Sequence, residues 1–96
     1  MKINTLKPEL VVVTGAGSGI GEATATRFAK NGAHVIVSDI DLEAAKVATA
    51  KMRGLGLRAS AAQLDVTDPA AWDRFALDVH ADHGIPDVLV NNAGML

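Results

Sequence analysis

The chain has 96 residues, of which 49% are hydrophobic, 21% are charged and 3% are aromatic, and its formal net charge is -2. This composition is typical of one folded domain and excludes a disordered or fibrous segment. A charge so close to neutrality gives no basic surface for DNA or RNA, the absence of cysteine excludes disulfide scaffolds and cysteine nucleophiles, and no apolar run approaches the roughly 20 residues of a membrane helix.

The chain begins with a short leader, residues 1–9, which lacks the apolar region of a signal peptide. We therefore expect a cytoplasmic protein that has neither a membrane nor a nucleic acid as its partner. The next segment, residues 10–14, is continuously apolar up to its last position, as a strand covered on both faces should be. Four glycines follow, and a helix is then predicted over about 20–31, with Ile20, Ala23 and Phe28 buried.

A second strand is predicted over 34–38, and it ends at Asp39. Asp41 can cap a second helix that ends near Gly54. A weaker strand over 58–64 follows, because its alanines and serine are poor strand formers.

The last part of the chain predicts one more helix and one more strand. Residues 65–69 form a turn, a helix cap and a proline at the first helical position, and His83 with Gly84 closes the helix. A strand over 87–90 comes next. The helix carries one apolar stripe, which consists of Trp72, Phe75, Ala76 and Val79.

Strands and helices thus alternate as β-α-β-α-β-α-β, which predicts an α/β fold with a parallel sheet. Right-handed crossovers place the strands in the order 3-2-1-4, a partial Rossmann-type doubly wound sheet. Ligands of such sheets bind beyond the carboxyl ends of the strands. Four segments are expected to meet at that edge: Thr14-Gly15, Asp39, Asp65 and 91–94.

The segment from Thr14 to Gly21 joins a buried strand to a helix and is rich in glycine. Such a turn lets the backbone approach a ligand closely, and the helix start offers N–H groups and a positive dipole end to a diphosphate. A plain flexible loop is the alternative. No Gly-Lys-Ser/Thr follows, which excludes a Walker-type loop, and the spacing is T-G-x-x-x-G-x-G rather than G-x-G-x-x-G.

This spacing, together with Asn91-Asn92-Ala93-Gly94 after the fourth strand, resembles the short-chain dehydrogenase/reductase family of the "classical" type. The resemblance extends from about Leu10 to Gly94, and it implies that this is the amino-terminal, cofactor-binding portion of such an enzyme. It implies that Asn92 steadies the sheet, that Ala93 and Gly94 line the adenosine side, and that Asp65 lies near the adenine. The complete set of cofactor-binding residues that we predict is Thr14, Gly15, Ser18, Gly19, Ile20, Gly21, Asp39, Ile40, Asp65, Val66, Asn92, Ala93 and Gly94.

Asp39 determines the predicted cofactor. It lies 18 residues after Gly21, close to the offset of about 20 residues at which an acidic residue binds the adenosine ribose. A carboxylate accepts hydrogen bonds from ribose hydroxyls and repels a 2'-phosphate, and the neighbours Ser18 and Ile40 supply no cation. The sequence therefore predicts NAD rather than NADP. Asp39 and Asp65 could instead be plain turn residues.

The resemblance also implies hydride transfer between nicotinamide and an alcohol or carbonyl substrate, with a Tyr-x-x-x-Lys pair moving the proton. The chain contains no tyrosine, so we assign no catalytic residue, and we predict no metal ligands, since His80 and His83 have no evident third partner. We expect residues 10–96 to be an NAD-binding portion truncated after its fourth strand, inactive alone, with a homo-oligomeric full-length enzyme. A non-catalytic dinucleotide-binding module and a structural fragment are the alternatives.

Overall fold

The computed structural model describes residues 8–93, which form three helices and four strands in the predicted alternation. Within these residues no helix combines the length and the apolarity needed to cross a membrane. The bounds of the elements are β1 Leu10–Thr14, α1 Gly19–Lys30, β2 His34–Asp39, α2 Leu42–Gly54, β3 Ala59–Gln63, α3 Pro69–His83 and β4 Val88–Asn91.

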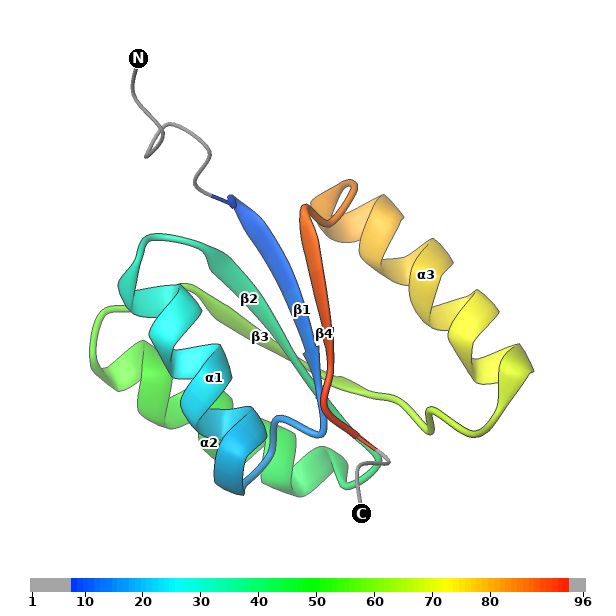
Figure 1. Ribbon diagram of the computed structural model, residues 1–96, viewed down its shortest axis with the longest axis horizontal. Coiled ribbons are helices and arrows are strands. Elements are labelled where there is room, and N and C mark those ends of the chain that lie inside the picture. The colour runs from blue at the N-terminus through cyan, green and yellow to red at the C-terminus, as the bar shows by residue number, and fades with distance from the viewer. Residues whose placement is uncertain (1–7, 94–96) are drawn as a thin grey trace.

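The four strands form one parallel sheet in the order β3-β2-β1-β4, which confirms the predicted α/β topology. In this register Val12 of β1 lies between Ile36 of β2 and Leu89 of β4. Figure 1 shows α1 and α2 on one face of the sheet and α3 on the other, so that β1 is covered on both sides. All five residues of β1 are buried, which explains why this strand is a continuous apolar run.

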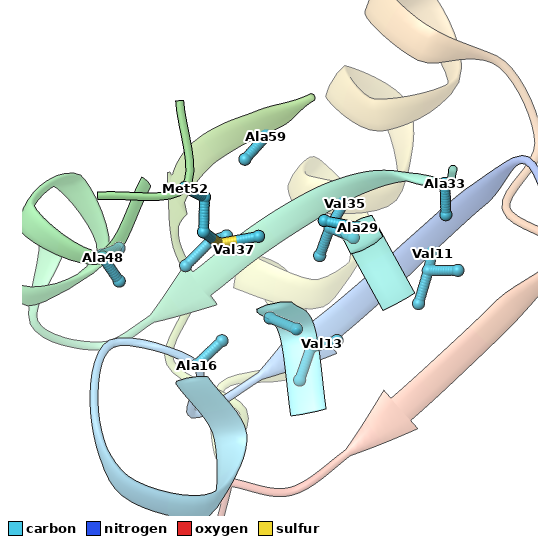
Figure 2. Close-up of a cluster of buried hydrophobic side chains, with 12 residues drawn as sticks. Val11, Val13, Ala16, Ala29, Ala33, Val35, Val37, Ala48, Met52 and Ala59 are labelled. Atoms are coloured by element: carbon cyan, nitrogen blue, oxygen red, sulfur yellow. The ribbon is translucent and has the colours of Figure 1, made fainter. Parts of the chain in front are cut away.

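The main core lies between the sheet and the helices α1 and α2 (Figure 2). Alternate residues of β1 and β2 point into it, because side chains of a strand alternate between its two faces. Small side chains on the helices let them approach the sheet closely. The buried residues of this cluster are Val11, Val13, Ala16, Ala25, Ala29, Ala33, Val35, Val37, Ala45, Ala48, Met52 and Ala59.

The opposite face carries a smaller cluster beneath α3. Val12 and Ile36 point to this side from the sheet, and Phe75 and Val79 from the helix. Trp72 lies at the margin of the cluster, where its indole N–H donates to the carbonyl oxygen of Val66 at 2.9 Å. The predicted stripe of α3 is therefore correct at three of its positions, but Ala76 is exposed.

The buried face of α1 differs from the predicted one. Ile20 is 78% exposed and Ala23 is also exposed, whereas Gly21, Ala25 and Ala29 are buried. The glycine turn explains the difference, because Gly21 packs directly against the backbone of Gly15 and so fixes which side of the helix faces the sheet. Phe28 is half-buried against the core, as predicted in part.

Candidate functional site

The polar segments that follow the strands lie together at one edge of the sheet. Thr14 at the end of β1 pairs in register with Asn91 at the end of β4, and Asp39 at the end of β2 pairs with Gln63 at the end of β3. Figure 1 shows the β1–α1 turn and the end of β4 at the same end of the molecule. The predicted convergence at the carboxyl edge is thus present for Thr14, Asp39 and Asn91, whereas Asp65 lies two residues beyond the end of β3.

In the turn between β1 and α1, Gly15 and Gly21 are required for different reasons. Gly15 has a φ of 62°, in the left-handed region that residues with a Cβ rarely adopt. At Gly21 a Cβ would overlap the carbonyl oxygen of Gly15 and stand 2.7 Å from the side-chain amide nitrogen of Asn92. The turn is further held by the amide of Ala16, which donates to the carbonyl of Ser38 at 2.9 Å.

The start of α1 presents backbone donors at the surface. Ser18, Gly19 and Ile20 are exposed, and the hydroxyl of Ser18, the N-cap residue, makes no capping hydrogen bond. The amide of Glu22 donates to the carbonyl of Ser18 at 3.3 Å, which is where the hydrogen-bond ladder of α1 begins. The amides of Gly19, Ile20 and Gly21 come before this point and have no partner in the ladder. Donors of this kind at the positive end of a helix dipole suit an anion.

The carboxylate of Asp39 lies against this turn. Its Oδ2 accepts a hydrogen bond from the amide of Gly17 at 2.9 Å, and its Oδ1 accepts one from the amide of Asp41 at 3.0 Å. The residue is only half-buried, and a carboxylate accepts about four hydrogen bonds in all. Asp39 therefore retains acceptor capacity for a donor that approaches from solvent.

The end of β4 is tied to the end of β1 by side chains. The hydroxyl of Thr14 donates to Oδ1 of Asn91 at 2.9 Å and accepts from the amide of Ala93 at 3.1 Å. The side-chain amide of Asn92 donates to the carbonyl of Gly15 at 3.3 Å. These hydrogen bonds join the ends of β1 and β4 beside the glycine turn. Gly94, also predicted to belong to the site, lies outside the described residues.

Ile40, Asp65 and Val66 lie farther from the turn. Ile40 and Asp65 line an open groove of about 810 Å³ that runs between β3 and α3, but the glycine turn does not line it. Oδ1 of Asp65 accepts hydrogen bonds from the hydroxyl and then the amide of Thr67, and these bonds hold the pKa of the carboxyl below its ordinary value. Asp65 thus has the local bonds of a turn residue, and Val66 packs partly against the core beneath α3.

Two further residues, Ser38 and Gln63, support the site, although neither belongs to a recognised motif. The buried hydroxyl of Ser38 donates to the carbonyl of Val13 at 2.8 Å, which joins the penultimate residues of β1 and β2. The side chain of Gln63 donates to the carbonyl of Ile40 at 3.1 Å. Because both are single contacts between segments far apart in sequence, only their position next to a strand end could have indicated them.

Two of the three histidines, His34 and His83, form a separate cluster away from this edge. The rings of His34 and His83 lie 4.8 Å apart, edge to face, and Nε2 of His34 is 2.8 Å from the hydroxyl of Ser60. Burial, and then the neighbouring charge of His83, lower the pKa of His34. Within residues 8–93 no three histidine, cysteine or acidic side chains are grouped closely enough to hold a metal ion.

A family model described as short chain dehydrogenase matches residues 9–96. The chain belongs to the short-chain dehydrogenase family. It is 50% identical over 86 residues to a probable oxidoreductase, EphD, of Mycobacterium tuberculosis, and 44% identical over 88 residues to the meso-2,3-butanediol dehydrogenase of Serratia marcescens.

Solved structures of this family have the same arrangement of strands and helices. A hydroxysteroid dehydrogenase from Escherichia coli matches with a TM-score of 0.86 and 39% identity over 91% of the chain. A metagenomic short-chain oxidoreductase in complex with NADP matches with a TM-score of 0.86 and 38% identity over 91% of the chain. In every case the relative is much longer: the chain spans 14% of EphD, 34% of the butanediol dehydrogenase, and 37% and 39% of the two solved chains.

Proposed function

We propose that residues 10–96 are the NAD(H)-binding portion of an oxidoreductase that transfers hydride between nicotinamide and an alcohol or carbonyl substrate. One observation carries this proposal. The Asp39 carboxylate, the glycine turn and the exposed start of α1 are joined at the carboxyl edge of the sheet, with Gly17 N and Asp39 Oδ2 only 2.9 Å apart. An anion site and a hydroxyl-binding acid in such proximity suit a nucleotide diphosphate with its adjoining ribose.

The residues at this edge fit a dinucleotide. The amides of Gly19 and Ile20 would hold the diphosphate, because they stand exposed at the start of α1. Asp39 would accept hydrogen bonds from the adenosine ribose with the acceptor capacity that Gly17 and Asp41 leave. The nicotinamide ring of a bound dinucleotide supplies the carbon that gives or takes the hydride. The chain's own contribution is to bind and orient that cofactor.

The same carboxylate favours NAD over NADP. A 2'-phosphate on the adenosine ribose would bring its negative charge next to Asp39. Within residues 8–93 no lysine or arginine is paired with this carboxylate, since the two ion pairs there are Lys46 with Glu43 and Lys51 with Glu22. One solved relative is a complex with NADP, so the proposed preference rests on Asp39 of the present chain and not on the family match.

The cofactor preference is tested by substitution at the end of β2. We expect Asp39→Asn to weaken NADH binding by about tenfold or more, because a hydrogen bond to a charged group contributes about 1.5–3 kcal/mol and tenfold corresponds to about 1.4 kcal/mol. Asp39→Ser with Ile40→Arg should raise the affinity for NADPH relative to NADH. Calorimetric titration of both cofactors measures these effects, and Asp73→Asn on the exposed side of α3 is the matched control. An unchanged ratio of the two affinities would contradict the role of Asp39.

The remaining assignments follow from the same proposal. We propose a cytoplasmic location, an alcohol or carbonyl compound as substrate, and a homo-oligomeric full-length enzyme, with neither nucleic acid nor membrane as partner. The family match to 9–96 and the dehydrogenase names of the relatives support the reaction class. The proposed binding set stays the one derived from the sequence, with Gly94 included, and no catalytic residue or metal ligand is assigned.

A further inference from the structure

Gly17 occupies a variable position of the T-G-x-x-x-G-x-G spacing, yet the structure leaves no room for a side chain there. A Cβ would stand 2.7 Å from Cβ of Ala44 and 2.9 Å from Oδ2 of Asp39. The φ of Gly17 is not in the left-handed region, so the backbone conformation does not itself demand glycine. The requirement comes from the close approach of the turn to α2 and to the end of β2.

The two neighbours of Gly17 differ in how they can respond. Ala44 belongs to the first turn of α2, and its amide is held by Oδ1 of Asp41 at 3.1 Å. Oδ2 of Asp39 is the end of a side chain that can rotate, and two bonds oppose this rotation: one from the Gly17 amide to Oδ2 at 2.9 Å and one from the Asp41 amide to Oδ1 at 3.0 Å. A Cβ at residue 17 would therefore displace the Asp39 carboxylate, and it would also push the turn away from Ala44, whose backbone carbonyl carbon stands 3.1 Å from that position.

We propose that Gly17 is a positioning residue for cofactor binding: because it has no Cβ, its amide reaches Asp39 Oδ2 and fixes the carboxylate beside the start of α1. The amide of Asp41 holds the other oxygen, at 3.0 Å. Gly17 and Asp41 together hold the acid in one orientation before any ligand arrives. This inference rests on the proposed function in one respect, namely that Asp39 binds the adenosine ribose.

The test separates packing against α2 from positioning of the carboxylate. NADH affinity and melting temperature are measured for the native chain, Gly17→Ala, Ala44→Gly and the double variant. Gly54→Ala is the matched control, because a Cβ at Gly54 meets no atom within 4 Å and its φ is not left-handed. We expect Gly17→Ala to weaken NADH binding about tenfold. Ala44→Gly removes the shorter of the two contacts with α2, the one with Cβ of Ala44, so the double variant should regain part of the melting temperature but not NADH affinity. Regained affinity in the double variant would overturn the proposal.

A double-mutant cycle with Asp39 tests whether the effect passes through the carboxylate. In an Asp39→Ala background, Gly17→Ala should change NADH affinity by less than about twofold, because the group that it displaces is gone. A further tenfold loss in that background would show that Gly17 acts on the cofactor by another route, and it would overturn the inference.

A third measurement keeps this inference distinct from the proposed function. Amide hydrogen exchange of residue 17, measured without cofactor, should be about tenfold faster in Gly17→Ala than in Gly54→Ala, because the bond to Asp39 is lost. If the native chain binds no NADH but this difference is found, the positioning of Asp39 stands and the assigned cofactor is wrong. Equal exchange at residue 17 in the two variants would refute the positioning itself.

Discussion

At the scale of single residues, the site depends on backbone groups that side chains hold in place. Two backbone amides hold the carboxylate of Asp39. The hydroxyl of Thr14 bonds both Asn91 and Ala93, and the side-chain amide of Asn92 donates to the carbonyl of Gly15. None of these bonds requires a ligand. The carboxyl edge is therefore organised before binding, which lowers the entropic cost of ordering it around a cofactor.

The glycine turn of the site could be predicted from the sequence, because glycines that directly follow a buried strand are typical of a tight turn. The spacing of Thr14, Gly15 and Gly21 predicted such a turn, and the structure has it. What could not be predicted was contact between distant segments. The need for glycine at position 17 arises only when α2 has packed against the turn, and no local pattern records that approach.

Asp87 makes pH-dependent hydrogen bonds at the amino-terminal ends of β1 and β4, opposite the candidate site. Its Oδ2 accepts from the amides of Leu10 at 2.9 Å and Glu9 at 2.8 Å, and these bonds hold the pKa of the carboxyl below its ordinary value. A carboxyl with a lowered pKa stabilises the fold above the pKa that it has in the unfolded chain. That contribution is lost as the pH falls through the lower, folded pKa.

We therefore expect Asp87→Asn to lower the melting temperature at neutral pH but to have less effect in acid. The melting curves of the native chain and the variant should converge as the pH falls from about 4 through the lower, folded pKa, because the native carboxyl becomes neutral only below that lowered pKa. Asp73→Asn, a change on the exposed side of α3, serves as the control. A difference in melting temperature that is the same at neutral pH and in acid would contradict this role of the charge.

At the scale of elements, the strands could be predicted more easily than the orientation of the helices. β3 forms over Ala59–Gln63 despite its weak strand propensity, because five residues pair in register with β2. The predicted strand over 58–64 was longer at both ends. The buried face of α1 was wrong because its rotation is set by contact between Gly21 and Gly15, which hydrophobic spacing does not reveal.

Helix α2 contains a buried polar group that the fold does not satisfy. Oγ1 of Thr49 is buried and has no hydrogen-bond partner among the described residues. Thr49→Val removes this hydroxyl at nearly constant shape, so we expect an increase in the free energy of unfolding of about 1 kcal/mol. Denaturant unfolding measures it. Thr26→Val on α1 is the control, since Oγ1 of Thr26 donates to the carbonyl of Glu22 at 2.9 Å and its removal should give no such gain.

A loss of stability in Thr49→Val comparable to that in Thr26→Val would contradict this account of α2. It would mean that the hydroxyl of Thr49 finds a partner in solution. The comparison matters for the site, because α2 carries Ala44 and packs against the glycine turn.

At the scale of the whole molecule, the sheet has two edge strands, β3 and β4, and β4 is the more apolar of the two. Val88 and Val90 are half-buried against the core below α1 and α2, while Leu89 on the other face is 53% exposed. Within residues 8–93, β4 pairs with β1 alone. An apolar edge strand with unpaired backbone groups is a site at which copies of a chain associate.

We therefore expect the 96-residue chain to associate as its concentration rises, and Leu89→Lys to reduce this association. A lysine at an edge strand opposes pairing with a second copy because its charge would be desolvated there.

Val47→Lys is a matched control, because Val47 is 56% exposed, close to the value for Leu89, but lies on α2 away from the edge. Sedimentation velocity over a range of concentrations distinguishes the two variants. If Val47→Lys reduces association as much as Leu89→Lys, then general surface hydrophobicity rather than the edge of β4 drives it. The prediction that copies of the chain associate through β4 would then be wrong.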